Sequence, residues 1–145
     1  MRSLGKKDLI DPVMEKMDKD PRSNAKKLAA EYAVGLVNDG DVVGLGTGST
    51  ARYAIEALAL RVREGLKITG VATSKATAAL AHDLAIPLVD LNETSTIDLT
   101  IDGADEVDPH FNMIKGGGGA LTREKLVAIA SNRRVILVDE SNLVD

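Results

Sequence analysis

Three short stretches of the sequence combine glycines with hydroxyl, acidic or basic side chains that could perform chemistry. They are 44–50 (GLGTGST), 102–106 (DGADE) and 115–125 (KGGGGALTREK). Glycines let a backbone turn sharply and approach a ligand closely, and free amides at a helix N-terminus attract anions. Acidic side chains next to a strand end can bind hydroxyl groups or transfer protons. The stretches therefore predict a site for a small molecule that carries both a phosphate and hydroxyl groups.

The first stretch is expected to hold the phosphate, with Ser49 and Thr50 adding hydroxyl donors to the amides of the following helix. It is not a Walker A loop, because Gly48 stands where that motif needs a lysine. A dinucleotide fingerprint also fits poorly, since Ser49 replaces its third glycine and no acidic residue follows the next predicted strand. A tight strand-to-helix turn without a ligand is the alternative.

The other two stretches supply acids, a cation and a second set of amides. Asp102 and Asp105 can point into one cleft, although Asp and Gly also form ordinary solvated turns. Four successive glycines at 116–119 can form a nest for an oxyanion, with Lys115 at its mouth. Glu124 can move a proton, or merely favour the start of a helix. Together these groups suit removal of a proton next to a carbonyl, through an enediolate, without redox chemistry or metal.

Strands alternating with helices are expected to position these groups. Apolar runs predict strands at 42–45, 68–71, 86–89, 99–101 and 135–138, and helices at 49–63, 74–84 and 121–130. A further helix should begin near Ser23 or Asn24 as its cap and end before 38–40, with apolar positions Leu28, Ala29, Tyr32, Ala33, Leu36 and Val37. This alternation predicts an α/β fold with a parallel sheet, in which ligands bind beyond the carboxyl ends of the strands.

Composition narrows the class of protein. With 44% hydrophobic residues in 145, the chain can form one packed domain, and the absence of cysteine excludes disulfides and thiolate nucleophiles. The chain has only two histidines, which is too few for a histidine-rich metal site. A net charge of -4 and only three aromatic residues disfavour nucleic-acid binding, which uses positive charge and stacking rings. Without a long apolar run or a secretory signal, the sequence predicts a soluble, cytoplasmic protein that binds neither membrane nor nucleic acid.

GLGTGSTA, DGADEVD and KGGGGALTREK, in this order, resemble the ribose-5-phosphate isomerase type A family, and the resemblance runs from about Asn24 to Asp145. It implies a Rossmann-like parallel sheet with helices on both faces. It also implies cofactor-free interconversion of ribose 5-phosphate and ribulose 5-phosphate in the pentose phosphate pathway, by a homodimer or homotetramer. Residues 23–145 would form this domain after a charged extension at 1–22, and the smaller ferredoxin-like part of the family would be missing.

The resemblance also implies roles for individual residues. Glu124 matches the proton acceptor, and Asp102 and Lys115 match catalytic positions that assist ring opening and steady the enediolate. The implied substrate-binding residues are Lys26, Thr47, Gly48, Ser49, Thr50, Asp102, Gly103, Ala104, Asp105, Lys115, Gly116, Gly117, Gly118 and Asn142. Asn142 departs from the family, which commonly has a lysine there, so phosphate affinity is expected to be lower. A non-catalytic sugar-phosphate-binding module and a nucleotide-binding domain are the competing hypotheses.

Overall fold

The centre of the molecule is a four-stranded, wholly parallel sheet. The computed structural model describes residues 22–117 and 119–145. Its strands are β1 (Val42–Leu45), β2 (Thr69–Ala72), β3 (Ile97–Gly103) and β6 (Ser131–Leu137), in the order β2-β1-β3-β6. Leu45 pairs with Ala72 on one side and with Ile101 on the other, and Gly103 pairs with Leu137. The carboxyl ends of the strands therefore lie along one edge, and the strand order reverses between β1 and β3.

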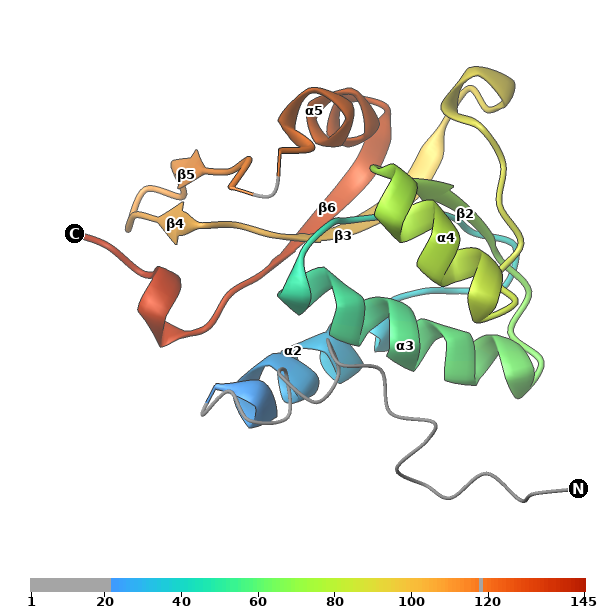
Figure 1. Cartoon of the computed structure of the whole chain (residues 1–145), viewed down its shortest axis with the longest axis horizontal. Coiled ribbons are helices and arrows are strands. Elements are labelled where there is room, and N and C mark those ends of the chain that lie inside the picture. The colour runs from blue at the N-terminus through green and yellow to red at the C-terminus, as the bar shows by residue number, and fades with distance from the viewer. Residues whose placement is uncertain (1–21, 118) are drawn as a thin grey trace, which may run out of the picture.

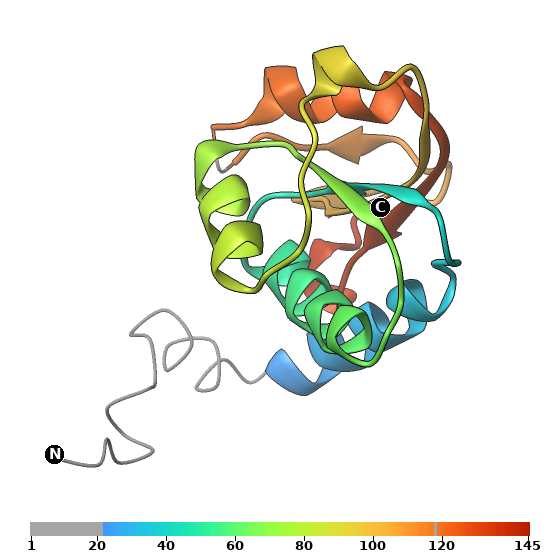
Figure 2. The same ribbon diagram turned by 90° about the vertical axis from the view of Figure 1, so that its right-hand side faces the viewer.

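Helices cover both faces of this sheet, as the sequence predicts. They are α2 (Ser23–Gly35), α3 (Ser49–Arg63), α4 (Lys75–Asp83) and α5 (Leu121–Ile129). Figures 1 and 2 place α2 and α3 on one side of the sheet and α5 on the other, with α4 beside β2. Figure 1 also shows the loops after β1 and β3 facing the start of α5. The predicted α/β class is confirmed.

The main core lies between the sheet and α2 and α3. Helix α3 buries Ala51, Ala54, Ile55, Leu58 and Ala59, which is the spacing of one helical face. All of these side chains except Ala51 pack in one cluster with Leu45, Leu99 and Ile101 of the sheet. A smaller cluster of Val71, Ile97 and Val127 joins the opposite face to α5. Burial of apolar surface on both faces fixes the strands whose ends carry the site.

The first helix differs from its prediction in its cap and in its buried face. Arg22 is the N-cap and no side chain caps the helix, so the expected cap at Ser23 or Asn24 is wrong. Leu28 and Tyr32 are 68% and 75% exposed, although their spacing suggested a core face. The buried stripe is rotated, and contains Lys26, Ala30, Ala33, Val34 and Val37. Small residues form this stripe because α2 packs closely against α3, with which it shares many contacts.

Two predicted strands also have different extents. The run at 86–89 makes only an isolated bridge between Leu88 and Gly70, because Pro87 has no N–H to donate to a longer ladder. The last strand begins at Ser131, four residues earlier than its apolar run.

The short strands β4 (Glu106–Val107) and β5 (Met113–Ile114) form a separate antiparallel pair. Two 3-10 turns, η2 (Leu91–Glu93) and η3 (Glu140–Asn142), complete the described elements.

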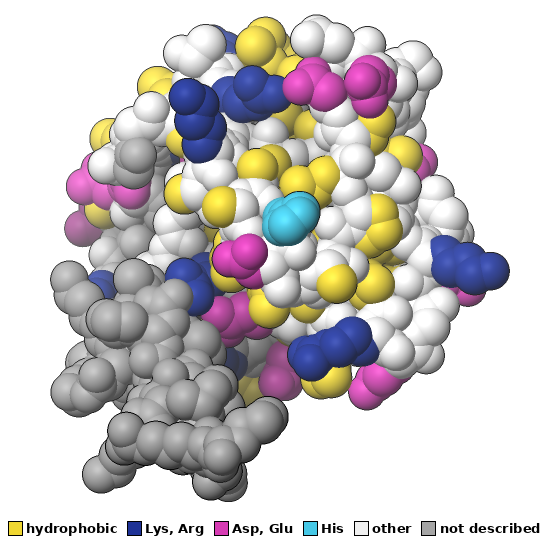
Figure 3. All heavy atoms as spheres, turned by 45° about the vertical axis from the view of Figure 1, so that its right-hand side comes forward, with side chains coloured by type: hydrophobic (Ala, Val, Ile, Leu, Met, Phe, Trp, Pro, Cys, Tyr) yellow, Lys and Arg dark blue, Asp and Glu magenta, His cyan; other side chains and the backbone are white. Residues whose placement is uncertain are grey.

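The surface of the described residues carries charges of both signs. On the face in Figure 3, acidic and basic side chains are interspersed with polar atoms and small hydrophobic areas. Within residues 22–117 and 119–145, no helix has the length and apolar character required to cross a membrane. The charged extension predicted at 1–22 lies outside the described residues except for Arg22.

Candidate active site

A cavity of about 260 Å³ opens at the carboxyl ends of β1, β3 and β6. This is the point where the strand order reverses, which is where ligands bind in open α/β sheets. The three stretches singled out in the sequence meet here. The predicted residues that line the cavity are Lys26, Thr47, Gly48, Ser49, Thr50, Gly103, Ala104, Asp105, Lys115, Gly116, Gly117, Glu124 and Asn142. Of the remaining predicted residues, Asp102 lies directly behind this lining, and Gly118 lies outside the described residues.

The loop after β1 forms one wall and ends at the N-terminus of α3. Gly48, the N-cap, has a φ of +102°, a conformation that glycine adopts without the steric cost that other residues pay. Lys26 on α2 is 8% exposed, and its Nζ donates to Ser49 Oγ at 3.3 Å. A buried ammonium group and the free amides of a helix start therefore face the same end of the cavity, which suits a phosphate.

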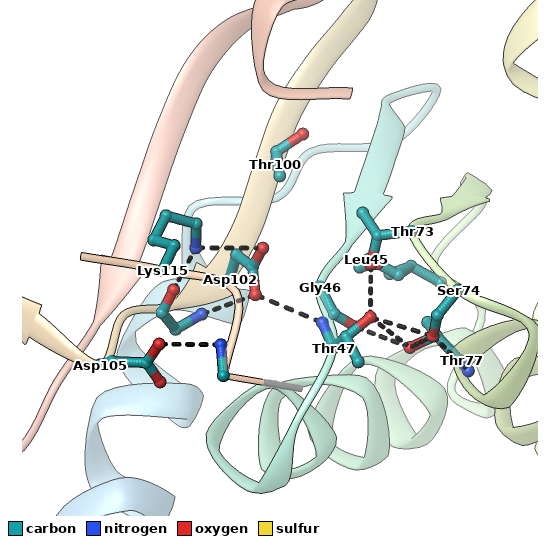
Figure 4. Close-up of polar contacts among 12 residues, drawn as sticks. Leu45, Gly46, Thr47, Thr73, Ser74, Thr77, Thr100, Asp102, Asp105 and Lys115 are labelled. Atoms are coloured by element: carbon teal, nitrogen blue, oxygen red, sulfur yellow. Dashed lines mark hydrogen bonds and ion pairs between the residues drawn. The ribbon is translucent and has the colours of Figure 1, made fainter. Parts of the chain in front are cut away.

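Asp102 connects two of the three stretches. It is 3% exposed, and its Oδ1 accepts hydrogen bonds from the backbone amides of Thr47 at 3.3 Å and Gly103 at 2.8 Å. Its Oδ2 lies 3.3 Å from Lys115 Nζ, which also donates to the Gly103 carbonyl (Figure 4). Since the ion pair and the two amides hold both oxygens, the carboxylate is fixed in orientation.

The glycine-rich stretch is tied to Asp105. The Gly117 amide donates to Asp105 Oδ2 at 2.9 Å, and a Cβ on Gly117 would lie 2.9 Å from Asp105 Oδ1. This close approach requires a glycine there. Lys115 and Gly117 therefore line the cavity from one chain segment that Asp102 and Asp105 hold in place.

Glu124 lies in the first turn of α5 and is 7% exposed. Its Oε2 is buried and has no hydrogen-bond partner among the described residues. Burial raises the pKa of its carboxyl, the negative charge of Asp102 raises it further, and the Lys115 ammonium opposes this rise. A carboxylate in this environment is a stronger base than one in water, and Glu124 lines the cavity.

Comparison with known proteins identifies the fold's family. A sequence model of Ribose 5-phosphate isomerase A (phosphoriboisomerase A) matches residues 69–145. The chain belongs to the ribose 5-phosphate isomerase A family. Ribose-5-phosphate isomerase A of Bacillus mycoides (strain KBAB4) is 57% identical over 121 residues, which are 83% of this chain and 55% of that protein. The chain therefore spans about half the length of the curated relatives that it matches.

Solved structures of the family share the fold. Ribose 5-phosphate isomerase A from Methanocaldococcus jannaschii superposes with a TM-score of 0.82 at 47% identity, over 85% of this chain and 55% of that one. A D-ribose-5-phosphate isomerase in complex with phospho-erythronic acid gives a TM-score of 0.82 at 44% identity, over 84% of this chain and 54% of that one. These matches confirm the Rossmann-like parallel sheet and helices predicted for the family.

Asn142 in this family member has a different set of contacts from the one expected of a phosphate ligand. Its Nδ2 donates to the Asp105 carbonyl at 3.2 Å, and its Oδ1 accepts from the Asp139 amide at 2.9 Å. Asn142 lines the cavity, but its amide group is used to connect the turn after β6 to the loop after β3. Its predicted role as a substrate-binding residue stays a prediction.

Two residues of the cavity were not among the predicted site residues. Asp139 follows β6 and is 7% exposed, and Arg22 donates to Ser141 Oγ at 2.6 Å. Burial raises the pKa of Asp139, but hydrogen bonds from Ser141 and the charges of Arg22 and Lys26 outweigh it, so the pKa is lowered overall. The position of Asp139 directly after a parallel strand could have identified it, whereas Arg22 belonged to the predicted extension and gave no such signal.

Within the described parts of the chain, no group of three or more His, Cys, Asp or Glu side chains could hold a metal ion. The cavity presents cations and amides at the α3 end and the carboxylate of Glu124 at the α5 end. Such an arrangement can hold an anion at one end and transfer a proton at the other.

Proposed function

We propose that this chain carries the site of an aldose–ketose isomerase that interconverts D-ribose 5-phosphate and D-ribulose 5-phosphate, a step of the non-oxidative pentose phosphate pathway. The observation that carries the proposal is the buried Glu124 carboxylate, which lines the same cavity as an anion-binding loop. Family membership and the phosphorylated acid bound by the related isomerase structure support the choice of substrate.

The phosphate would bind at the N-terminus of α3. Backbone amides from Gly48 to Thr50 would donate to its oxygens, and the buried ammonium of Lys26 would balance part of its charge of about -1.5 to -2 at neutral pH. Anchoring this end would direct the carbonyl end of the open-chain sugar toward Glu124. Asp105 and the Gly103–Ala104 backbone, which line the space between, would contact the sugar hydroxyls.

Glu124 would then act as the base. Its carboxylate would take the proton from C2 of ribose 5-phosphate, and the electrons of the C–H bond would form the C1–C2 double bond of an enediolate. The Lys115 ammonium would stabilise the negative oxygen. Glu124 would return the proton to C1 while the proton of the C2 hydroxyl moves to O1, so that C2 becomes the ketone carbon of ribulose 5-phosphate. A positioned base of this kind contributes roughly 10²–10⁴-fold to rate.

Asp102 would both fix Lys115 and keep Glu124 basic. Its carboxylate pairs with the ammonium at 3.3 Å, and its negative charge raises the pKa of Glu124. We propose that it also assists opening of the sugar ring by exchanging a proton with the ring oxygen. Lys115 in turn limits the rise in the pKa of Glu124.

Deuterium uptake at C2 of ribose 5-phosphate in D₂O, followed by proton NMR, tests this function. The wild-type chain should exchange the C2 proton and form ribulose 5-phosphate. Glu124→Gln should abolish both reactions while substrate still binds, because the amide cannot accept the proton. Glu93→Gln, on the exposed turn η2, is the matched control and should behave as wild type. Retention of exchange by the Glu124 variant would show that another group is the base.

A non-catalytic sugar-phosphate-binding module is the second candidate, because the amides at the start of α3 and the Lys26 ammonium can hold a phosphate without catalysing a reaction. It predicts that ribose 5-phosphate binds with no deuterium uptake in the wild-type chain. Calorimetric binding and the exchange assay on one preparation therefore separate the two functions.

Assembly into homodimers or homotetramers is also part of the proposal. Phe111, Ile114 and Leu143 are 81%, 59% and 58% exposed, and Leu143 bridges to Val107 of the same short sheet. Exposed apolar side chains gathered in one region are typical of surfaces that pack against another chain. Light scattering over a concentration series would measure the mass of the particle.

A further inference from the structure

A cluster of hydroxyl groups lies on the side of Thr47 that faces away from Asp102. Thr47 Oγ1 is 2.8 Å from Thr73 Oγ1, 3.0 Å from Ser74 Oγ and 3.3 Å from Thr77 Oγ1. Thr73 and Thr77 are 1% and 4% exposed, and they come from the end of β2 and the first turn of α4. Figure 4 shows the cluster on one side of the loop and Asp102 on the other. None of these three partners is used by the proposed reaction.

The hydroxyl protons in this cluster have defined directions. Thr73 Oγ1 donates to the Leu45 carbonyl at 2.7 Å, and Thr77 Oγ1 donates to the Gly46 carbonyl at 2.8 Å. Each threonine has one hydroxyl proton, so neither donates to Thr47, whose own hydroxyl proton goes to Ser74 Oγ. Ser74 Oγ donates to Thr77 Oγ1 at 3.0 Å and accepts from the Thr77 amide at 3.1 Å. The cluster therefore holds two successive carbonyls and one side chain of the loop at the same time.

The loop is confined between this cluster and Asp102. On the Asp102 side, the Gly46 amide donates to the Ile101 carbonyl at 2.9 Å, and the Thr47 amide donates to Asp102 Oδ1 at 3.3 Å. A Cβ on Gly46 would lie 2.2 Å from Asp102 Oδ1, so the backbone is already in close contact. A shift of the loop away from Asp102 would press it against Thr73 and Thr77, whose hydroxyls already contact the Leu45 and Gly46 carbonyls at 2.7 and 2.8 Å. The hydroxyl cluster thus sets the separation between the Thr47 amide and the carboxylate.

We propose that Thr73 and Thr77 are positioning residues for the reaction. They hold the Gly46–Thr47 backbone so that the Thr47 amide stays bonded to Asp102, and they thereby fix the carboxylate that orients Lys115 and raises the pKa of Glu124. They touch no substrate. This inference rests on the proposed function for its effect on turnover, whereas its effect on the Thr47 amide is independent of that function.

The test compares Thr73→Val and Thr77→Val, each of which replaces a hydroxyl by a methyl group of similar size, with Thr73→Ser and Thr77→Ser, which retain the hydroxyl. We expect each valine variant to increase the hydrogen-exchange rate of the Thr47 amide about tenfold or more, since that amide loses its fixed acceptor. We expect kcat for C2 exchange to fall by roughly 10–100-fold, with a smaller change in KM because the phosphate-binding amides of α3 remain. The serine variants should restore both quantities.

Thr100→Val is the matched control. Thr100 is 3% exposed, and its hydroxyl bonds to Ser131 Oγ rather than to the loop. This variant should lose stability as the others do, without a change in Thr47 amide exchange or in the kcat-to-KM pattern. If one valine variant does not fold, the other gives the same test, because each holds a different carbonyl of the loop.

The outcomes separate this proposal from the proposed function. Wild-type Thr47 amide exchange in both valine variants would overturn the positioning role, whatever the activity. Equal effects in Thr100→Val would overturn it as well, since general destabilisation would then be the cause. A third outcome is that the wild-type chain shows no C2 exchange while the valine variants still show faster Thr47 amide exchange. This outcome would support the positioning of the loop by Thr73 and Thr77 and reject the isomerase function.

Discussion

Substitution of Gly46 by alanine would test how closely the loop after β1 must approach Asp102. An added Cβ would lie 2.2 Å from Asp102 Oδ1, 2.5 Å from its Cγ and 2.7 Å from its Cα, where ordinary contacts begin at 3.4 Å. Rotation of the Asp102 side chain can relieve the first two contacts but not the third, because the Cα belongs to the backbone of β3. The strands must therefore separate, or the carboxylate must move, by a sizeable fraction of an ångström.

This clash leads to two quantitative expectations for Gly46→Ala. Overpacking of this kind costs about 1–3 kcal/mol of unfolding free energy, measurable by urea denaturation. Misplacement of Asp102 by about 1 Å should lower the rate of C2 exchange about 100-fold. Gly35→Ala is the control, because its Cβ would meet nothing within 4 Å, and it should keep wild-type stability or exceed it. Wild-type stability together with wild-type exchange in Gly46→Ala would refute the argument.

Three further predictions concern the charged groups. The pKa of Glu124 is raised by folding, so ionisation of this carboxyl destabilises the folded state as the pH rises. Glu124→Gln should therefore increase the unfolding free energy near pH 8. This gain should vanish toward about pH 4, below the pKa of the carboxyl in both the folded and the unfolded state. Lys115→Met removes the ammonium that lowers the pKa of Glu124 and pairs with Asp102, so the acidic limb of the pH–rate profile should move to higher pH. Movement to lower pH would contradict the effect assigned to Lys115 on the pKa of Glu124. Lys26→Met keeps an apolar stem but removes the charge beside Ser49, so calorimetry should record roughly tenfold weaker binding of inorganic phosphate, an effect of about 1.4 kcal/mol, and unchanged affinity would place the phosphate elsewhere.

The sequence alone determined the kind of site and the edge of the sheet that carries it. Apolar runs followed by GTGST and DGADE predict that both stretches follow parallel strands, and the carboxyl ends of parallel strands necessarily share an edge. Glu124 could be chosen because it follows a glycine-rich stretch at the start of a periodic helix. These inferences hold because they depend on local patterns and on one general property of parallel sheets.

The tertiary structure decided which side chains point into the cavity and which support it. Leu28 and Tyr32 share the spacing of core residues, yet periodicity defines only a stripe, and the close packing of α2 on α3 selects the neighbouring stripe of small residues. Asn142 has the amide group of a ligand, but its Oδ1 accepts from the Asp139 amide and its Nδ2 donates to the Asp105 carbonyl. The hydroxyl cluster around Thr47 joins residues about 30 positions apart in the chain. Such contacts depend on where folding places distant segments, and no local pattern of residues encodes that placement.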